Sequence, residues 1–229
     1  MALEQAINNA AQIALLKNNL KKGKTEEQKQ AIDYLFGENE SQGCGCLSQL
    51  TTITNQQYMA IVQRKCEEFD TRARALEKIG LDPSQVQEIP PIVLSSFVYD
   101  DDCHVRVDNG VAVSSQYSIT WIFFSATQMY TYKYVFDTTS SDTWEITNDF
   151  FYGDITCFTT GHSVKEKIRV TAAKGCLGTE TVNKSRYVVD TLEVIVPGTK
   201  YIVSLTNSPT VEQSIQAAKA MLREKKYSK

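Results

Sequence analysis

The chain has 229 residues, of which 42% are hydrophobic and 22% are charged, and its formal net charge is −3. A chain of this length can bury a core without metal ions or disulfide bonds. Neither part of it is basic, because residues 1–90 carry ten Lys and Arg against twelve Asp and Glu and the rest carries fourteen against fifteen, and this balance argues against nucleic acid as a partner.

The first residues do not have the basic-then-apolar order of a signal peptide, since polar residues such as Glu4 and Asn8 interrupt them. The uncharged run over 109–132 is long enough to cross a membrane, but its many polar side chains and partial alternation indicate paired strands. We therefore expect a cytoplasmic protein, and we expect its six cysteines to be reduced thiols.

Residues 1–80 are predicted to form a helical region with three helices. Apolar residues at steps of three and four predict helices over about 2–22 and 56–79. Thr25 followed by Gln28 fits a capping box that opens another helix over about 25–36. The apolar positions of the third helix form a seam that requires a partner helix, either in this chain or in a second copy: Met59, Val62, Cys66, Phe69, Ala73 and Leu76.

Residues 81–91 are predicted to be a linker, because proline lacks an N–H group and Pro90-Pro91 cannot continue a helix. Beyond the linker the hydrophobic period becomes two, which is typical of strands. Asn109-Gly110 and Pro197-Gly198 mark tight hairpins. Many short strands at near-regular spacing indicate a sandwich or a small barrel.

Two further strands are predicted over 117–125 and 128–136, with Tyr130, Tyr132 and Tyr134 on one face. We expect this aromatic face to pack against the opposite sheet. The chain is then expected to end in an amphipathic helix over 209–226.

A domain of about seven strands followed by one amphipathic helix resembles a pleckstrin-homology-like (PH-like) domain. Three segments carry the resemblance: FFYGDITCFTTG (150–161), LEVIVPGTKYIVSL (192–205) and TVEQSIQAAKAMLREKK (210–226). The first of these is similar to an element of bacterial members of that superfamily. The resemblance implies an α+β fold in which 92–229 form a PH-like antiparallel β-barrel or sandwich, closed by the C-terminal helix.

The resemblance also implies a non-catalytic scaffold that binds proteins, peptides or, in some members, lipid headgroups. The stretch Asp100-Asp101-Asp102 is acidic, and Arg106 is its only cation before Asp108. Since an acidic rim repels phosphates, phosphoinositide binding is disfavoured.

Cys44 and Cys46, in the stretch Gly43-Cys44-Gly45-Cys46, could bind zinc or interchange as a redox dithiol. A structural zinc site needs four ligands, however, and the sequence has no second CxxC and no HxxxH. Cys66 could add a third ligand, but it lies on the predicted seam and is expected to behave as a small hydrophobic residue. A reduced loop is the preferred interpretation, with a metal or redox role as the alternative.

Cys103 and His104 have the residue types of a nucleophile and its base. Neighbouring residues of a strand point to opposite faces, so we expect Cys103 inside and His104 in solvent. The chain contains no P-loop, dinucleotide fingerprint, HExxH or GxSxG motif. The prediction is therefore that no residue serves in catalysis, cofactor binding or metal binding, and that the chain is not an enzyme.

The sequence thus favours a non-catalytic protein- or peptide-binding module, or self-association through the helical region. One alternative is a thiol redox or zinc-binding protein that uses Cys44 and Cys46. Another is a membrane-surface adaptor that uses the basic tail Arg223–Lys229, although a membrane is not the expected partner. A groove beside an open strand edge would indicate addition of a peptide.

Overall fold

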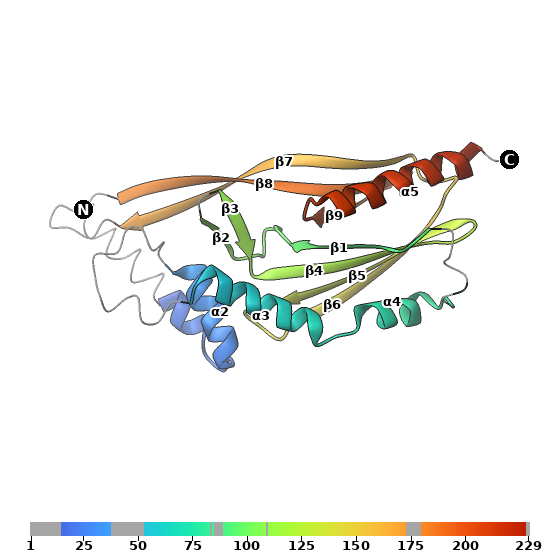
Figure 1. Cartoon of the computed structure of the whole chain (residues 1–229). Coiled ribbons are helices and arrows are strands. Elements are labelled where there is room, and N and C mark those ends of the chain that lie inside the picture. The colour runs from blue at the N-terminus through green and yellow to red at the C-terminus, as the bar shows by residue number, and fades with distance from the viewer. Residues whose placement is uncertain are drawn as a thin grey trace.

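The computed structural model describes residues 15–37, 53–82, 84, 89–108, 110–172 and 180–227. Cys44, Cys46 and the first part of the helix predicted over 2–22 lie outside these residues. The fold is mixed, with antiparallel sheets and helices (Figure 1). The helices are α2 (Glu26–Phe36), α3 (Asn55–Glu67), α4 (Thr71–Ile79) and α5 (Pro209–Tyr227). None of the helices in this described part is long and apolar enough to cross a membrane.

The capping box predicted at Thr25 is confirmed, because its side chain accepts a hydrogen bond from the Gln28 amide and the Gln28 side chain accepts one from the Thr25 amide. Residues 15–20 are helical, and Gly23 follows them with a positive φ of 70°. The second predicted helix is therefore confirmed as α2, and the first is confirmed where it is described.

The single helix predicted over 56–79 is wrong, because the chain ends α3 at Glu67 and starts α4 at Thr71. Asp70 caps the new helix by accepting a hydrogen bond from the Ala73 amide at 3.0 Å. Phe69, in the break, packs on Tyr134 with 4.7 Å between ring centroids. The apolar steps of three and four continue across the break since both helices lie on the same sheet.

The strands form a four-stranded sheet in the order β1-β4-β5-β6, a two-stranded sheet β2-β3 and a three-stranded sheet β7-β8-β9. None of the described sheets closes into a barrel, so the barrel form of the prediction is wrong. Their bounds are β1 (Ile92–Phe97), β2 (Val105–Asp108), β3 (Val111–Ser114), β4 (Gln116–Phe124), β5 (Gln128–Asp137), β6 (Thr143–Phe151), β7 (Cys157–Ala172), β8 (Glu180–Val196) and β9 (Thr199–Leu205). The predicted change of period after Pro90-Pro91 is confirmed.

One face of the four-stranded sheet lies under helices α2, α3 and α4 (Figure 1). Tyr58 and Val62 of α3 pack with Phe97 and Phe136 of the sheet, and Ala75 of α4 belongs to a second cluster that contains five aromatic residues of this face. The predicted seam therefore lies mainly on the chain's own sheet.

The tyrosines of β5 correct the expectation that they pack against the opposite sheet. Tyr132 and Tyr134 pair in register with Trp121 and Ile119 of β4, and this face is the one that the helices cover. Cross-strand pairing and the helices together remove the aromatic rings from water.

The other face of the four-stranded sheet shares the largest core with the three-stranded sheet and with α5. Ile122 and Phe124 of β4 lie there together with Leu192 of β8, and all three are fully buried. Helix α5 adds an apolar stripe to the same core, made of Ile215, Ala218, Met221 and Leu222. The amphipathic helix predicted over 209–226 is thus confirmed as an element that packs on the strands.

Strands β7 and β8 form a long hairpin that extends beyond this core (Figure 1). The ring centroids of Tyr99 and Tyr187 lie 5.2 Å apart, and Lys165 Nζ donates a hydrogen bond to the Tyr99 carbonyl at 2.6 Å. The cross-strand pair Val164 and Val188 lies on the opposite face of the hairpin, since side chains alternate along a strand. Both valines are exposed, at 60% and 48%.

Candidate functional site

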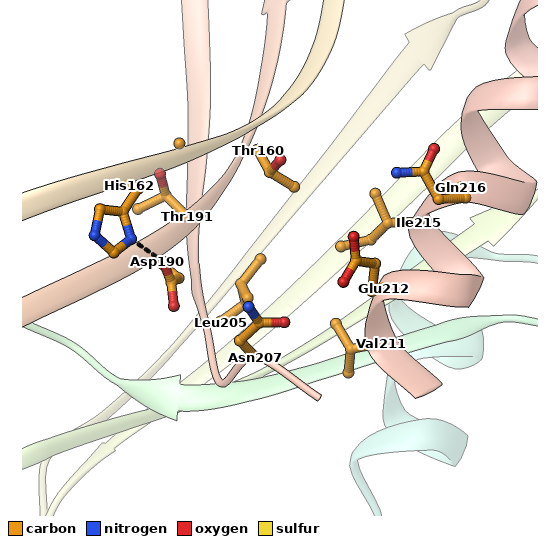
Figure 2. A pocket seen from close by; sticks show the side chains of 11 residues that line it. Thr160, His162, Asp190, Thr191, Leu205, Asn207, Val211, Glu212, Ile215 and Gln216 are labelled. Atoms are coloured by element: carbon orange, nitrogen blue, oxygen red, sulfur yellow. Dashed lines mark hydrogen bonds and ion pairs between the residues drawn. The ribbon is translucent and has the colours of Figure 1, made fainter. Parts of the chain in front are cut away.

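A pocket of about 260 Å³ lies between the β7–β8 hairpin and the first turns of α5 (Figure 2). It forms where the apolar core of the three-stranded sheet ends. Thr160 of β7 is paired with the buried Leu192, and the next residues on the same face are His162 and its partner Asp190. Polar side chains therefore replace the core along this face, and the pocket lies beside them.

The start of α5 fixes the other wall of the pocket. Ser208 caps the helix, because its Oγ accepts a hydrogen bond from the Val211 amide at 3.2 Å, and Pro209 suits the first helical position. Val211, Glu212 and Ile215 of the first two turns then line the pocket opposite the strands.

His162 and Asp190 form an ion pair or hydrogen bond across the two strands, with 2.8 Å between Nδ1 and Oδ1. The His162 side chain is 66% exposed and that of Asp190 is 28% exposed, so the pair lies at the rim. The bond uses Nδ1 and leaves Nε2 of the imidazole for a ligand or for water.

Glu212 places a second carboxylate in the pocket, on the helix side (Figure 2). It lies in the first turn of α5, where the positive end of the helix dipole stabilises a negative charge. Within the described part of the chain its carboxylate has no ion-pair partner. Among the residues that the structure describes, the lining thus holds two carboxylates against at most one positive charge, that of His162, and contains no Lys or Arg.

The rest of the lining combines an apolar wall with amide groups. Leu205, Val211 and Ile215 supply the apolar part, and Asn207 and Gln216 add carboxamides that can donate or accept hydrogen bonds. Pockets that bind organic ligands have this combination of apolar walls with a few polar groups.

Gly161 of β7 and its cross-strand partner Thr191 of β8 also line the pocket. A Cβ atom at this position would lie 2.7 Å from Thr191 Oγ1, which is much closer than such atoms approach in proteins. A side chain at 161 would therefore displace Thr191, which also lines the pocket.

Of the cysteines that the structure describes, Cys103 is buried, and Cys66 and Cys157 are partly buried. Cys66 packs beside the cluster under α2 and α3, and burial raises the pKa of its thiol to about 11. Cys103 is buried, its Sγ donates a hydrogen bond to Gln116 Oε1 at 3.2 Å, and burial raises the pKa of its thiol as well. Thiols in such surroundings remain protonated at neutral pH and are poor nucleophiles.

The prediction that His104 faces solvent is wrong, because its ring packs edge-on against Phe36 of α2, with 4.8 Å between the centroids. Burial lowers the pKa of His104 below its ordinary value. Cys103 lies inside, as expected, and its polar contact is with Gln116 instead of with this imidazole.

The other polar features of the sequence have local structural roles. Asp100, Asp101 and Asp102 form an exposed turn, in which the Asp100 carbonyl accepts a hydrogen bond from the Cys103 amide. Lys226, in the basic tail, donates a hydrogen bond to the Ile155 carbonyl at 3.2 Å. Over the described residues, no three His, Cys, Asp or Glu side chains come together as they would around a metal ion.

Sequence reasoning missed the residues of the pocket, since His162 and Asp190 are 28 positions apart and meet only through the hairpin register. The sequence of β8 held one sign of the pocket, which is a break in its apolar alternation. Leu192 and Val194 are apolar and buried, and Asp190 is the position where this alternating series breaks.

Comparisons with known proteins give no relative: no protein-family model, curated protein sequence or solved structure matches the chain.

Proposed function

We propose that this chain is a non-catalytic module that binds an extended segment of a partner protein, and that the segment lies along β7 and enters the pocket beside α5. The observation that carries the proposal is that an edge strand, β7, adjoins this pocket. Thr160, Gly161 and His162 of that strand line the pocket.

β7 is an edge strand, because the sheet has the order β7-β8-β9. Within the described residues β7 pairs with β8 alone, and its outer backbone groups have no strand beside them. Such an edge can hydrogen-bond to an extended peptide, while neighbouring pockets select the peptide's side chains.

β6 is also an edge strand, and Trp144 and Ile146 on it are exposed at 37% and 41%. Its exposed apolar side chains could also contact a partner. The pocket, however, lies at β7 and supplies polar groups that can give specificity. We therefore place the peptide at β7 and treat β6 as the competing site in the experiment below.

A PH-like fold is part of the same proposal. Its support is the order of elements, in which a four-stranded sheet is followed by a three-stranded one and then by a single helix. Two features depart from that pattern: the β2–β3 hairpin stands between β1 and β4, and helices α2 to α4 cover the four-stranded sheet.

The test is a selection of peptides from a random twelve-residue library on the immobilised full chain, followed by hydrogen–deuterium exchange with the best peptide. The proposal predicts slower exchange in 157–167 of β7 and in the first turns of α5, with β6 unchanged. Failure to select any peptide, or slower exchange confined to 143–151 of β6, would contradict it.

A further inference from the structure

We infer that the pocket takes a basic side chain, lysine or arginine, and that the recognised segment carries an aliphatic residue two positions away from it. The inference rests on the proposed function and adds the chemistry of the segment. Its first support is the charge of the lining, where Asp190 and Glu212 provide carboxylates from opposite walls (Figure 2).

Both carboxylates have acceptor capacity for a cation. His162 contacts one oxygen of Asp190, which leaves the other, and no described residue forms an ion pair with Glu212. Hydrogen bonds from an ammonium or guanidinium group to carboxylates are stronger than those between neutral groups. A cation held between the two walls would therefore satisfy charges that the chain itself leaves with few partners.

An anionic group would not be stabilised in the same place. The start of a helix attracts anions, but Glu212 already puts a negative charge into the first turn of α5. A phosphate or carboxylate of the ligand would lie beside this charge and that of Asp190, and like charges repel at such distances.

The apolar wall fits the stem of a long basic side chain. Lysine and arginine bury their methylene groups along apolar surface and keep the charged end among polar groups. Leu205, Val211 and Ile215 provide that surface, and Asn207 and Gln216 can accept hydrogen bonds from the N–H groups at the end of the side chain.

The spacing between the basic and the aliphatic side chain of the recognised segment follows from the strand period. An added strand presents alternate side chains to one face, about 6.6 to 6.8 Å apart. The pocket lies at His162, and the exposed pair Val164 and Val188 follows on the same face of the hairpin. A segment with a basic residue at the pocket thus covers these valines with the residue two positions away, in either chain direction.

The experiment repeats the random-library selection on the wild-type chain, on the variant D190N/E212Q, and on the variant D149N/E224Q. The last variant is the control, since it removes two negative charges from exposed positions of β6 and α5. The wild type and the control are expected to enrich Lys or Arg two positions from Val, Ile or Leu. The variant D190N/E212Q is expected to lose the basic residue from its selected peptides.

A second measurement uses fluorescence anisotropy with the best wild-type peptide and a copy that has norleucine in place of its basic residue. This replacement should weaken binding to the wild type about tenfold or more, and binding to D190N/E212Q less than twofold. Two results would overturn the inference and leave the proposed function standing. One is a set of selected peptides that protects β7 from exchange but is not enriched in Lys or Arg. The other is that norleucine weakens binding equally in the wild type and in D190N/E212Q. If n-butylammonium displaced the peptide at equal concentration, the pocket would be a site for free amines, which contradicts the inference.

Discussion

The guanidinium of Arg106 lies over the ring of Tyr34, with 4.4 Å between its central carbon and the ring centroid. Its Nη1 also donates a hydrogen bond to the Tyr34 carbonyl at 2.6 Å, and its Nε pairs with Asp108. Arg106 is only 6% exposed. Through this buried charge, helix α2 is joined to the β2–β3 hairpin.

Replacing Arg106 by Met should lower the free energy of unfolding by about 2 kcal/mol or more, because the Asp108 carboxylate would lose its ion pair and the Tyr34 carbonyl would keep the Gly37 amide but lose the guanidinium as a donor. The measurement is equilibrium unfolding in urea. R186M is the matched control, since Arg186 pairs with Glu166 on the surface with 75% of its side chain exposed, and it should cost less than about 1 kcal/mol. Equal losses in the two variants would contradict the account of Arg106.

Removing the hydroxyl of Tyr58 tests the contact between α3 and the strands. Tyr58 is fully buried, and its hydroxyl donates a hydrogen bond to the Ser114 carbonyl at 2.6 Å. Tyr58→Phe should lower the free energy of unfolding by about 1 to 2 kcal/mol, because a buried carbonyl loses a donor. Tyr130→Phe, whose half-buried hydroxyl bonds to the neighbouring Gln128, should have a smaller effect, and the reverse order would contradict this assignment.

The core between the two larger sheets can be tested with matched truncations on β8. Leu192 is fully buried in the largest cluster, so Leu192→Ala should cost about 2 to 5 kcal/mol. Val188 is 48% exposed on the same strand, so Val188→Ala should change stability by less than about 0.5 kcal/mol. A small effect at Leu192 would mean that the two sheets do not share a core.

His104 is expected to give the protein a pH-dependent stability. Burial lowers its pKa from the ordinary value of 6.5, Asp137 opposes this effect, and Lys167 adds to it. The folded state therefore binds the proton less well than the unfolded state. The contribution of His104 is fully present above about pH 6.5 and is lost as the pH falls through the folded pKa.

His104→Gln should accordingly reduce the loss of stability on going from pH 7 to pH 5, as measured by urea unfolding at each pH. If the stabilities of the wild type and of His104→Gln fell by the same amount over this range, burial against Phe36 would not lower the pKa of His104.

Local signals in the sequence predicted much of the fold. Thr25 and Gln28 predicted a cap, which forms, and Pro197-Gly198 predicted the turn between β8 and β9, where Gly198 has a φ of 84°. These features depend on neighbouring residues, so propensity and turn chemistry suffice to find them. The break at 68–70 was missed because its apolar spacing matches a continuous helix.

Tertiary arrangement could not be predicted in the same way. The tyrosine face of β5 has the right period, but nothing local specifies whether a sheet or a helix covers it. The pocket depends on the register that places His162 beside Asp190 and on where α5 begins. Register is set by pairing across the whole hairpin, and for that reason Asp190 is recognisable only as an irregular position in an apolar series.

Contact between a bound peptide and the pocket is measured most directly by nuclear Overhauser effects in a methyl-labelled sample. With the best selected peptide, the account predicts effects between the methylene protons of its basic side chain and the methyl groups of Val211 and Ile215. It predicts none to the methyl groups of Ile146 on β6. Effects to Ile146 with none to Val211 or Ile215 would contradict the central claim that the partner segment binds at β7 and α5.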